Sequence, residues 1–244
     1  MKWLVRYLTM VAIAFLGLQL FFVGRIALMA VWDPQSTAFQ RSEAWRLANE
    51  SRLRWSQHWV DYGQISDQLK RAVIASEDDG FSQHDGVDWD ALKKAWSKNE
   101  RAEQQTEKLA IRQGTAGKVK PAKVVGGSTI TQQLAKNLLL SGERTLLRKG
   151  QELILTFALE RLLSKRRILE IYLNSVEWGE GVFGAEAAAQ HYFRKPAARL
   201  SAYEAARLAV MLPRPRYFEK LPKSGYLASR AEVIAARMPN ALLP

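Results

Sequence analysis

Residues 7–24, YLTMVAIAFLGLQLFFVG, carry no charge and decide where the rest of the chain can lie. At about 1.5 Å per residue, a helix over this run nearly crosses the roughly 30 Å hydrocarbon core of a bilayer. Arg25 can snorkel to the interface, and Trp3 and Trp32 suit the two boundary zones. We therefore expect an uncleaved transmembrane anchor within residues 1–32. A cleaved signal peptide is the alternative, but the run is long for one and no small-x-small site follows it cleanly.

The charges around this run predict its orientation and the class of partner. Lys2 and Arg6 precede it, which favours a cytoplasmic N-terminus with everything after Trp32 outside. The formal net charge of +12 indicates an anionic partner. Outside the cytoplasm, lipid headgroups or a lipid-linked phosphate are better candidates than nucleic acid. The absence of cysteine excludes disulfides, thiolate metal sites and a cysteine nucleophile.

Helical periodicity dominates the sequence beyond the anchor. Residues 33–62 indicate a polar connector, and residues 63–244 indicate one mainly helical domain with few alternating strands. Within it, residues 97–125 lack an apolar stripe and contain glycine and proline, which predicts a mobile charged loop. The other helices are expected across 146–174 and at about 185–193 and 201–212.

Three adjacent acids, Glu77, Asp78 and Asp79, follow a helical pattern that Ser66 can cap and Gly80 can end. We expect them in the last helical turn, where the macrodipole disfavours each negative charge by about 0.3–1 kcal/mol. Both this effect and their mutual repulsion raise carboxyl pKa values, which suits a general base. A helix end with solvated acids is the simpler explanation of this stretch alone.

The stretch GGSTITQQLAKNLLL contains a capping box formed by Thr129 and Gln132. On the helix that follows, Gln132, Gln133, Lys136 and Asn137 form a polar stripe opposite an apolar face. Several amides with one cation can bind sugar hydroxyls and phosphates. An ordinary solvent-facing surface has the same pattern.

Arg148 and Glu152 stand four residues apart on one helix face, with Lys149 beside them. As an ion pair alone, this spacing contributes about 0.2–0.5 kcal/mol to helix stability. Alternatively, Glu152 is a second functional carboxylate, since glycosyl chemistry uses two acids from separate segments.

Two further patterns indicate little about function. The run Gly179–Gly184 fits GxGxxG, but helical sequence on both sides argues against a dinucleotide-binding βαβ unit. His84 and the two other histidines lack metal-ligand spacing, so a hydrogen-bonding or structural role is favoured.

Four motifs together resemble the peptidoglycan glycosyltransferases of glycosyltransferase family 51, specifically the monofunctional membrane-anchored type. They are EDDGFSQHDG at 77–86, GGSTITQQLAKN at 126–137, RKGQE at 148–152 and RRILEIYLN at 166–174. Their order and spacing agree with the family over about 150 residues. Arg166 stands where the family has lysine, and the segment between the first two motifs is longer and more charged than expected.

The resemblance implies a mainly helical, lysozyme-like lobe with a small jaw lobe near the membrane. It also implies processive, inverting polymerisation of lipid II, with undecaprenyl pyrophosphate displaced and β-1,4 links formed, at the bacterial cytoplasmic membrane. The implied partners are lipid II, the nascent glycan strand, membrane lipids and other cell-wall synthesis proteins, without nucleic acid. No tightly bound cofactor is implied, although a divalent cation, Mg or Mn, could assist at the donor pyrophosphate.

Residue by residue, Glu77 matches the family's general base and Glu152 its second, donor-side acid. Lys136 and Arg148 match residues that hold donor phosphates, whereas Asp79 falls at a variable position. The implied substrate-binding residues are Asp78, Phe81, His84, Ser128, Thr129, Gln132, Gln133, Lys136, Asn137, Arg148 and Lys149.

Two other functions are compatible with parts of the sequence. A lysozyme-like hydrolase or lytic transglycosylase also pairs carboxylates on helical lobes, and a membrane-tethered scaffold would explain the basic charge. The chain contains no S-x-x-K motif, so we expect no transpeptidase activity.

Overall fold

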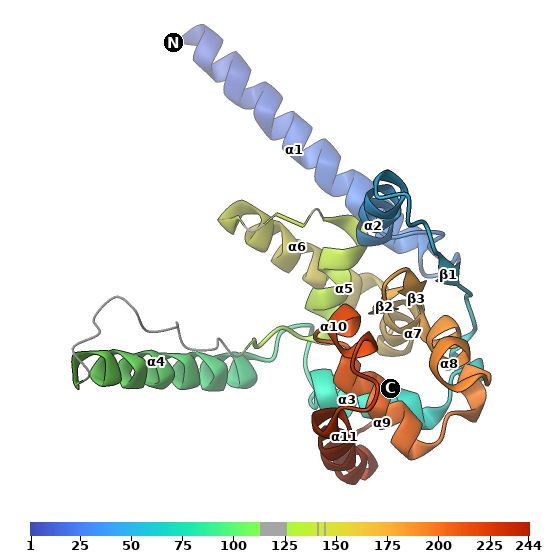
Figure 1. Cartoon of the computed structure of the whole chain (residues 1–244). Coiled ribbons are helices and arrows are strands. Elements are labelled where there is room, and N and C mark those ends of the chain that lie inside the picture. Colours follow the sequence, from blue (N-terminus) through green and yellow to red (C-terminus); the bar gives the residue numbers. More distant parts are fainter. Residues whose placement is uncertain (113–125, 141, 144) are drawn as a thin grey trace.

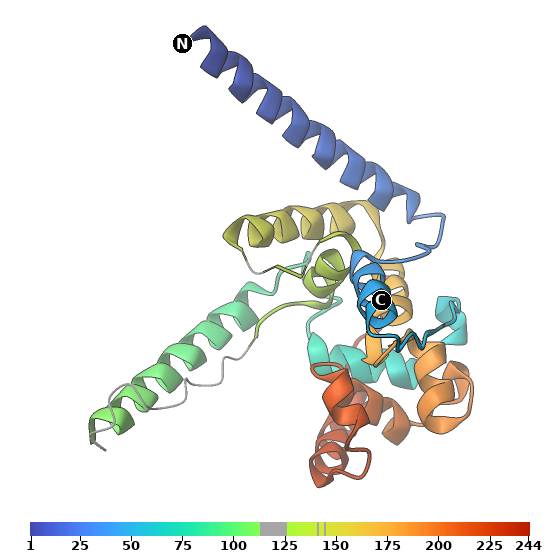
Figure 2. The same ribbon diagram turned by 45° about the horizontal axis from the view of Figure 1, so that its top comes forward.

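The computed structural model describes residues 1–112, 126–140, 142–143 and 145–244. Helix α1, Lys2–Leu28, projects away from a helical body (Figures 1 and 2). It is long and apolar enough to cross a membrane, and 6% of its most apolar window is buried. Its C-terminal end enters the body, where Ile26 and the adjacent Met29 join the core, and Gln19 hydrogen-bonds to Gln151 at 3.0 Å. The predicted N-terminal apolar helix is confirmed, and its length and composition fit an anchor or a signal.

The body is mainly helical, as the sequence predicts. Helix α3 packs against α9 and α11, while α5 packs against α6 and α7, and the two groups share one core. The helices are α2 Ala38–Asn49, α3 Asp67–Glu77, α4 Trp89–Arg112, α5 Ile130–Leu139, α6 Leu146–Leu162, α7 Lys165–Ser175, α8 Ala185–Phe193, α9 Ala202–Met211, α10 Pro215–Glu219 and α11 Gly225–Arg237. Short 3-10 turns lie at Tyr62–Gln64, Ala197–Arg199 and Met238–Asn240.

Capping side chains begin several of these helices. The Ser66 hydroxyl accepts from the Leu69 N–H at 3.2 Å and begins α3 as predicted. Thr129 and Gln132 form the predicted capping box of α5. The single helical region expected across 146–174 is two helices, because Ser164 caps a new helix, α7.

Part of the expected loop at 97–125 differs from the structure. Helix α4 continues to Arg112, so residues 97–112 are helical where the sequence predicts a mobile loop. The missing apolar stripe is explained by position, since α4 projects from the body and has little core to cover (Figures 1 and 2). Residues 113–125 of the expected loop lie outside the described residues.

A small sheet of order β1-β3-β2 closes one side of the body. Strand β1, Ser56–Gln57, is parallel to β3, Val182–Phe183, and β2, Glu177–Gly179, is antiparallel to β3. The glycine-rich run forms no βαβ unit, as expected, but it forms a hairpin that the sequence does not predict. Residues 33–62, expected as a connector, supply α2 and β1 to the folded body.

The hairpin turn depends on Gly181, which has φ +73°. A Cβ at this position would lie 2.0 Å from the backbone oxygen of Arg54, in the segment leading to β1. We expect Gly181→Ala to lower the free energy of unfolding by at least about 1–3 kcal/mol, because positive φ and backbone overlap both oppose it. Gly63→Ala is the matched control, since a Cβ there meets nothing within 4 Å. Thermal unfolding in detergent measures both, and equal midpoints would contradict the prediction.

Candidate active site

A cleft of about 1010 Å³ lies between α2, α3, α5, the start of α6 and the β2 edge. Six of the predicted site residues line it together, although they come from three separate segments. They are Glu77, Ser128, Gln133, Lys136, Asn137 and Arg148. The cleft therefore combines the Glu77 carboxylate with hydroxyl, amide and cationic groups, a set suited to a phosphorylated sugar, and a second carboxylate, Glu177, lines its β2 edge.

Glu77 is the last residue of α3 and faces this cleft. Its Oε2 accepts a hydrogen bond from Gln133 Nε2 at 3.0 Å, and the Ser76 hydroxyl lies 3.5 Å from Oε1. Burial raises the pKa of Glu77; hydrogen bonds from Gln133 and Ser76 oppose the shift, and the nearby charge of Asp78 adds to it. A raised carboxyl pKa is the property expected of a general base.

Tyr172 of α7 belongs to the same arrangement, although the motifs predict no role for it. Its hydroxyl donates to Gln133 Oε1 at 3.0 Å, which turns the amide so that Nε2 faces Glu77. Burial raises the pKa of Tyr172 well above its usual range, so its hydroxyl stays protonated and can donate. The motif RRILEIYLN places a tyrosine here, but one-dimensional spacing does not show that it reaches α5.

Asp78 has a structural position, because it ends α3 and does not extend its last turn. Its Oδ2 accepts from the Ile130 N–H at 2.9 Å, at the start of α5, and its Oδ1 lies 2.9 Å from His84 Nε2. Of the three acids, only Glu77 is helical. The prediction that all three lie in the last helical turn is therefore wrong. Asp79 is exposed, 3.3 Å from Arg237.

Four other predicted site residues support the cleft from behind and do not line it. Phe81 is fully buried, with the Lys165 ammonium 4.6 Å from its ring centroid. Thr129 and Gln132 are buried in the α5 cap, and the Thr129 hydroxyl donates to the Gly86 carbonyl at 2.6 Å. His84 is the fourth, held by Asp78.

Glu152 is buried on α6 and pairs with the two neighbouring cations. Arg148 Nη1 donates to Glu152 Oε2 at 3.1 Å, and Lys149 Nζ donates to Oε1. Arg148 lines the cleft, so Glu152 anchors the guanidinium that faces the substrate space. Arg148 Nε is buried and has no partner among the described residues.

The donor set around Glu152 does not fit a protein-held divalent cation. Both of its oxygens already accept from cations, whereas such an ion needs several oxygen ligands. Among the described residues, no three His, Cys, Asp or Glu side chains are grouped to hold a metal.

Comparison with known proteins identifies the family. Residues 46–239 match the Transglycosylase family model, which covers most of the chain. The chain belongs to the transglycosylase family. A protein of Burkholderia thailandensis, named biosynthetic peptidoglycan transglycosylase, is 54% identical over 244 residues, spanning 100% of this chain and 88% of that protein. The protein of the same name from Paraburkholderia phytofirmans is 51% identical over 100% of this chain and 94% of its own length.

The family match places all four sequence motifs of this transglycosylase within one domain. It begins at residue 46, inside α2, so α1 and the first part of α2 precede the matched region. The cleft is nevertheless lined in part by α2 residues from before this boundary.

Proposed function

We propose that the chain polymerises peptidoglycan glycan strands from lipid II and does not hydrolyse them. The observation that carries this proposal is a carboxylate with a raised pKa, Glu77, in one cleft with the cations Lys136 and Arg148. A base and a phosphate-binding group are what transfer from a pyrophosphate requires. The names of the relatives point to the same activity.

In the proposed reaction, ionised Glu77 removes the proton from the 4-hydroxyl of lipid II. That oxygen attacks C1 of the terminal sugar of the growing chain and forms the new C–O bond. The bond from C1 to undecaprenyl pyrophosphate breaks, and the configuration inverts from α to β. Lys136 and Arg148 stabilise the negative charge of the departing pyrophosphate. Glu152 is a positioning residue that orients Arg148.

We further propose that α1 stays in the bacterial cytoplasmic membrane as a single-pass anchor. Lys2 and Arg6 would then lie in the cytoplasm, with the cleft outside, beside a lipid-linked substrate. A divalent cation at the donor pyrophosphate and contacts with other cell-wall synthesis proteins remain predictions.

The test is incubation of the detergent-solubilised full chain with lipid II and, separately, with polymeric glycan. We expect lipid II to be converted to long strands with release of undecaprenyl pyrophosphate, and the polymer to remain intact. Cleavage of the polymer without consumption of lipid II would instead support the lysozyme-like hydrolase or lytic transglycosylase.

A further inference from the structure

Three cationic side chains line the cleft among the described residues: Arg41, Lys136 and Arg148. Lys136 and Arg148 come from α5 and α6, within the family match, and the proposed function uses both. Arg41 comes from α2, before residue 46 where that match begins. The cleft therefore has one cation that no motif explains.

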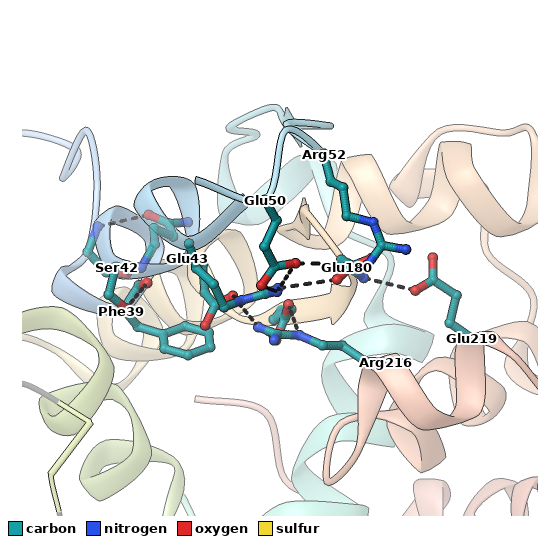
Figure 3. Close-up of polar contacts among 12 residues, drawn as sticks. Phe39, Ser42, Glu43, Glu50, Arg52, Glu180, Arg216 and Glu219 are labelled. Carbon is teal, nitrogen blue, oxygen red and sulfur yellow. Dashed lines mark hydrogen bonds and ion pairs between the residues drawn. The ribbon is translucent and has the colours of Figure 1, made fainter. Parts of the chain in front are cut away.

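Helix α2 is fixed against the body by a network of charges (Figure 3). Arg46 contacts three carboxylates, at 2.8 Å from Glu43, 2.9 Å from Glu50 and 3.2 Å from Glu180 in the β2–β3 turn. Hydrogen bonds to Glu43 and Glu50 raise the pKa of Arg46, so its guanidinium stays protonated.

A second arginine joins the same helix to α10 and the sheet. Arg216 lies 2.6 Å from Glu43 and 2.8 Å from Glu177. Glu177 lines the edge of the cleft, so this ion pair joins α10 to the cleft wall. Phe39 packs edge-on against Phe183, with ring centroids 6.1 Å apart. The α2 wall of the cleft is thus held by contacts that do not involve Arg41.

The two arginines of α2 have different surroundings. Arg41 and Arg46 are five residues apart, roughly 140° around the helix axis. No carboxylate pairs with Arg41 among the described residues; its Nη1 donates to the Ser36 carbonyl and hydroxyl, each at 3.1 Å. A guanidinium has five N–H donors, and Arg41 is exposed at the cleft, so it can still bind an oxyanion.

The proposed reaction needs a second phosphate-binding group. It joins two lipid-linked molecules, each with a pyrophosphate between its lipid and its sugar, and therefore at the membrane surface. In the proposed reaction, Lys136 and Arg148 bind only the pyrophosphate of the donor. Arg41 lies near the membrane because its partner, Ser36, is in the short segment after α1, which ends at Leu28.

We propose that Arg41 binds the pyrophosphate of the acceptor lipid II. This inference rests on the proposed function, and it gives the α2 wall a role in acceptor binding. The same phosphate chemistry is present in anionic lipid headgroups, so the experiment must distinguish the two sources.

The test uses a preformed lipid-linked glycan oligomer as donor and titrates lipid II as acceptor with the full chain. Arg41→Gln, Arg41→Lys and the control Arg230→Gln are compared in detergent micelles without anionic lipid, and then in phosphatidylcholine vesicles with and without phosphatidylglycerol. Arg230 is an exposed α11 residue outside the cleft. We expect Arg41→Gln to raise the KM for lipid II about tenfold, the effect of one charge-assisted contact, with kcat and thermal midpoint nearly unchanged. Arg41→Lys should recover part of the loss, and Arg230→Gln should match the wild type.

Three results would overturn the assignment. An unchanged KM for lipid II in Arg41→Gln would remove Arg41 from acceptor binding. A raised KM for the donor oligomer instead would place Arg41 at the other phosphate. A defect confined to vesicles containing anionic phosphatidylglycerol, absent in micelles and phosphatidylcholine vesicles, would assign Arg41 to the lipid headgroups. In each of these cases the wild-type enzyme would still polymerise lipid II. If the wild-type enzyme itself did not polymerise lipid II, the proposed function would be wrong.

Discussion

Replacement of Glu77 by glutamine is expected to reduce lipid II polymerisation by about 10²–10⁴-fold, the usual contribution of a general base. Glutamine keeps the size of the side chain, and its carbonyl oxygen can still accept from Gln133 Nε2, which lies 3.0 Å from Glu77 in the wild type. It cannot take a proton from the acceptor hydroxyl. Turnover of lipid II at a fixed enzyme concentration measures the loss, and wild-type turnover would exclude Glu77 as the base.

Although Glu77→Gln is expected to lose activity, it is not expected to lose stability. Because burial raises the folded-state pKa of Glu77, its contribution to stability is present below the unfolded pKa and lost as pH rises through the folded pKa. Activity needs ionised Glu77, so the wild-type rate should rise as pH rises through the folded-state pKa of Glu77. Glu77→Gln removes the cost of a buried charge and should be at least as stable as the wild type at neutral pH. Thermal midpoints across a pH series test this, and a variant unfolded at neutral pH would contradict it.

Much of this site could be predicted because its signals are local. The Thr129–Gln132 box fixes the start of α5, and that start sets which side chains of the polar stripe face the cleft. Gln132 nevertheless turns back into the cap, whereas Gln133, Lys136 and Asn137 line the cleft. Helical spacing predicted the stripe as a whole, but capping geometry decided which members are available to a substrate.

Other features depend on contacts between distant segments and have no local signal. Tyr172 reaches Gln133 across 39 positions of sequence, and Arg216 reaches Glu43 across a still longer separation. Arg41 lies on a segment that composition alone indicates to be a connector. In each case the side chain gains its role from the packing of helices against one another, which periodicity within one helix does not specify.

Asp78→Asn is expected to destabilise the fold by about 3 kcal/mol and to impair polymerisation through the displacement of Glu77 and α5. The Gly86 N–H donates to His84 Nδ1, so that nitrogen carries no proton and Nε2–H donates to Asp78. The Asp78 carboxylate therefore accepts from two donors, His84 Nε2 and the Ile130 N–H. Asparagine offers one oxygen and one NH₂, so either orientation sets a donor against a donor and leaves a buried group unsatisfied.

Asp79→Asn is the matched control for this variant, since it makes the same chemical change one residue further on. Asp79 is exposed, and its 3.3 Å contact with Arg237 is a surface pair, so its replacement should alter unfolding by less than about 0.5 kcal/mol. Denaturant titration in detergent compares the two, with polymerisation measured well below both unfolding midpoints. A comparable stability loss in both variants would mean that general charge, and not the two hydrogen bonds, explains the effect. A stability loss confined to Asp78→Asn would show that this carboxylate joins the Glu77 segment to the start of α5. Among the described residues, no other carboxyl group in the 77–86 motif accepts hydrogen bonds from both His84 and the Ile130 N–H.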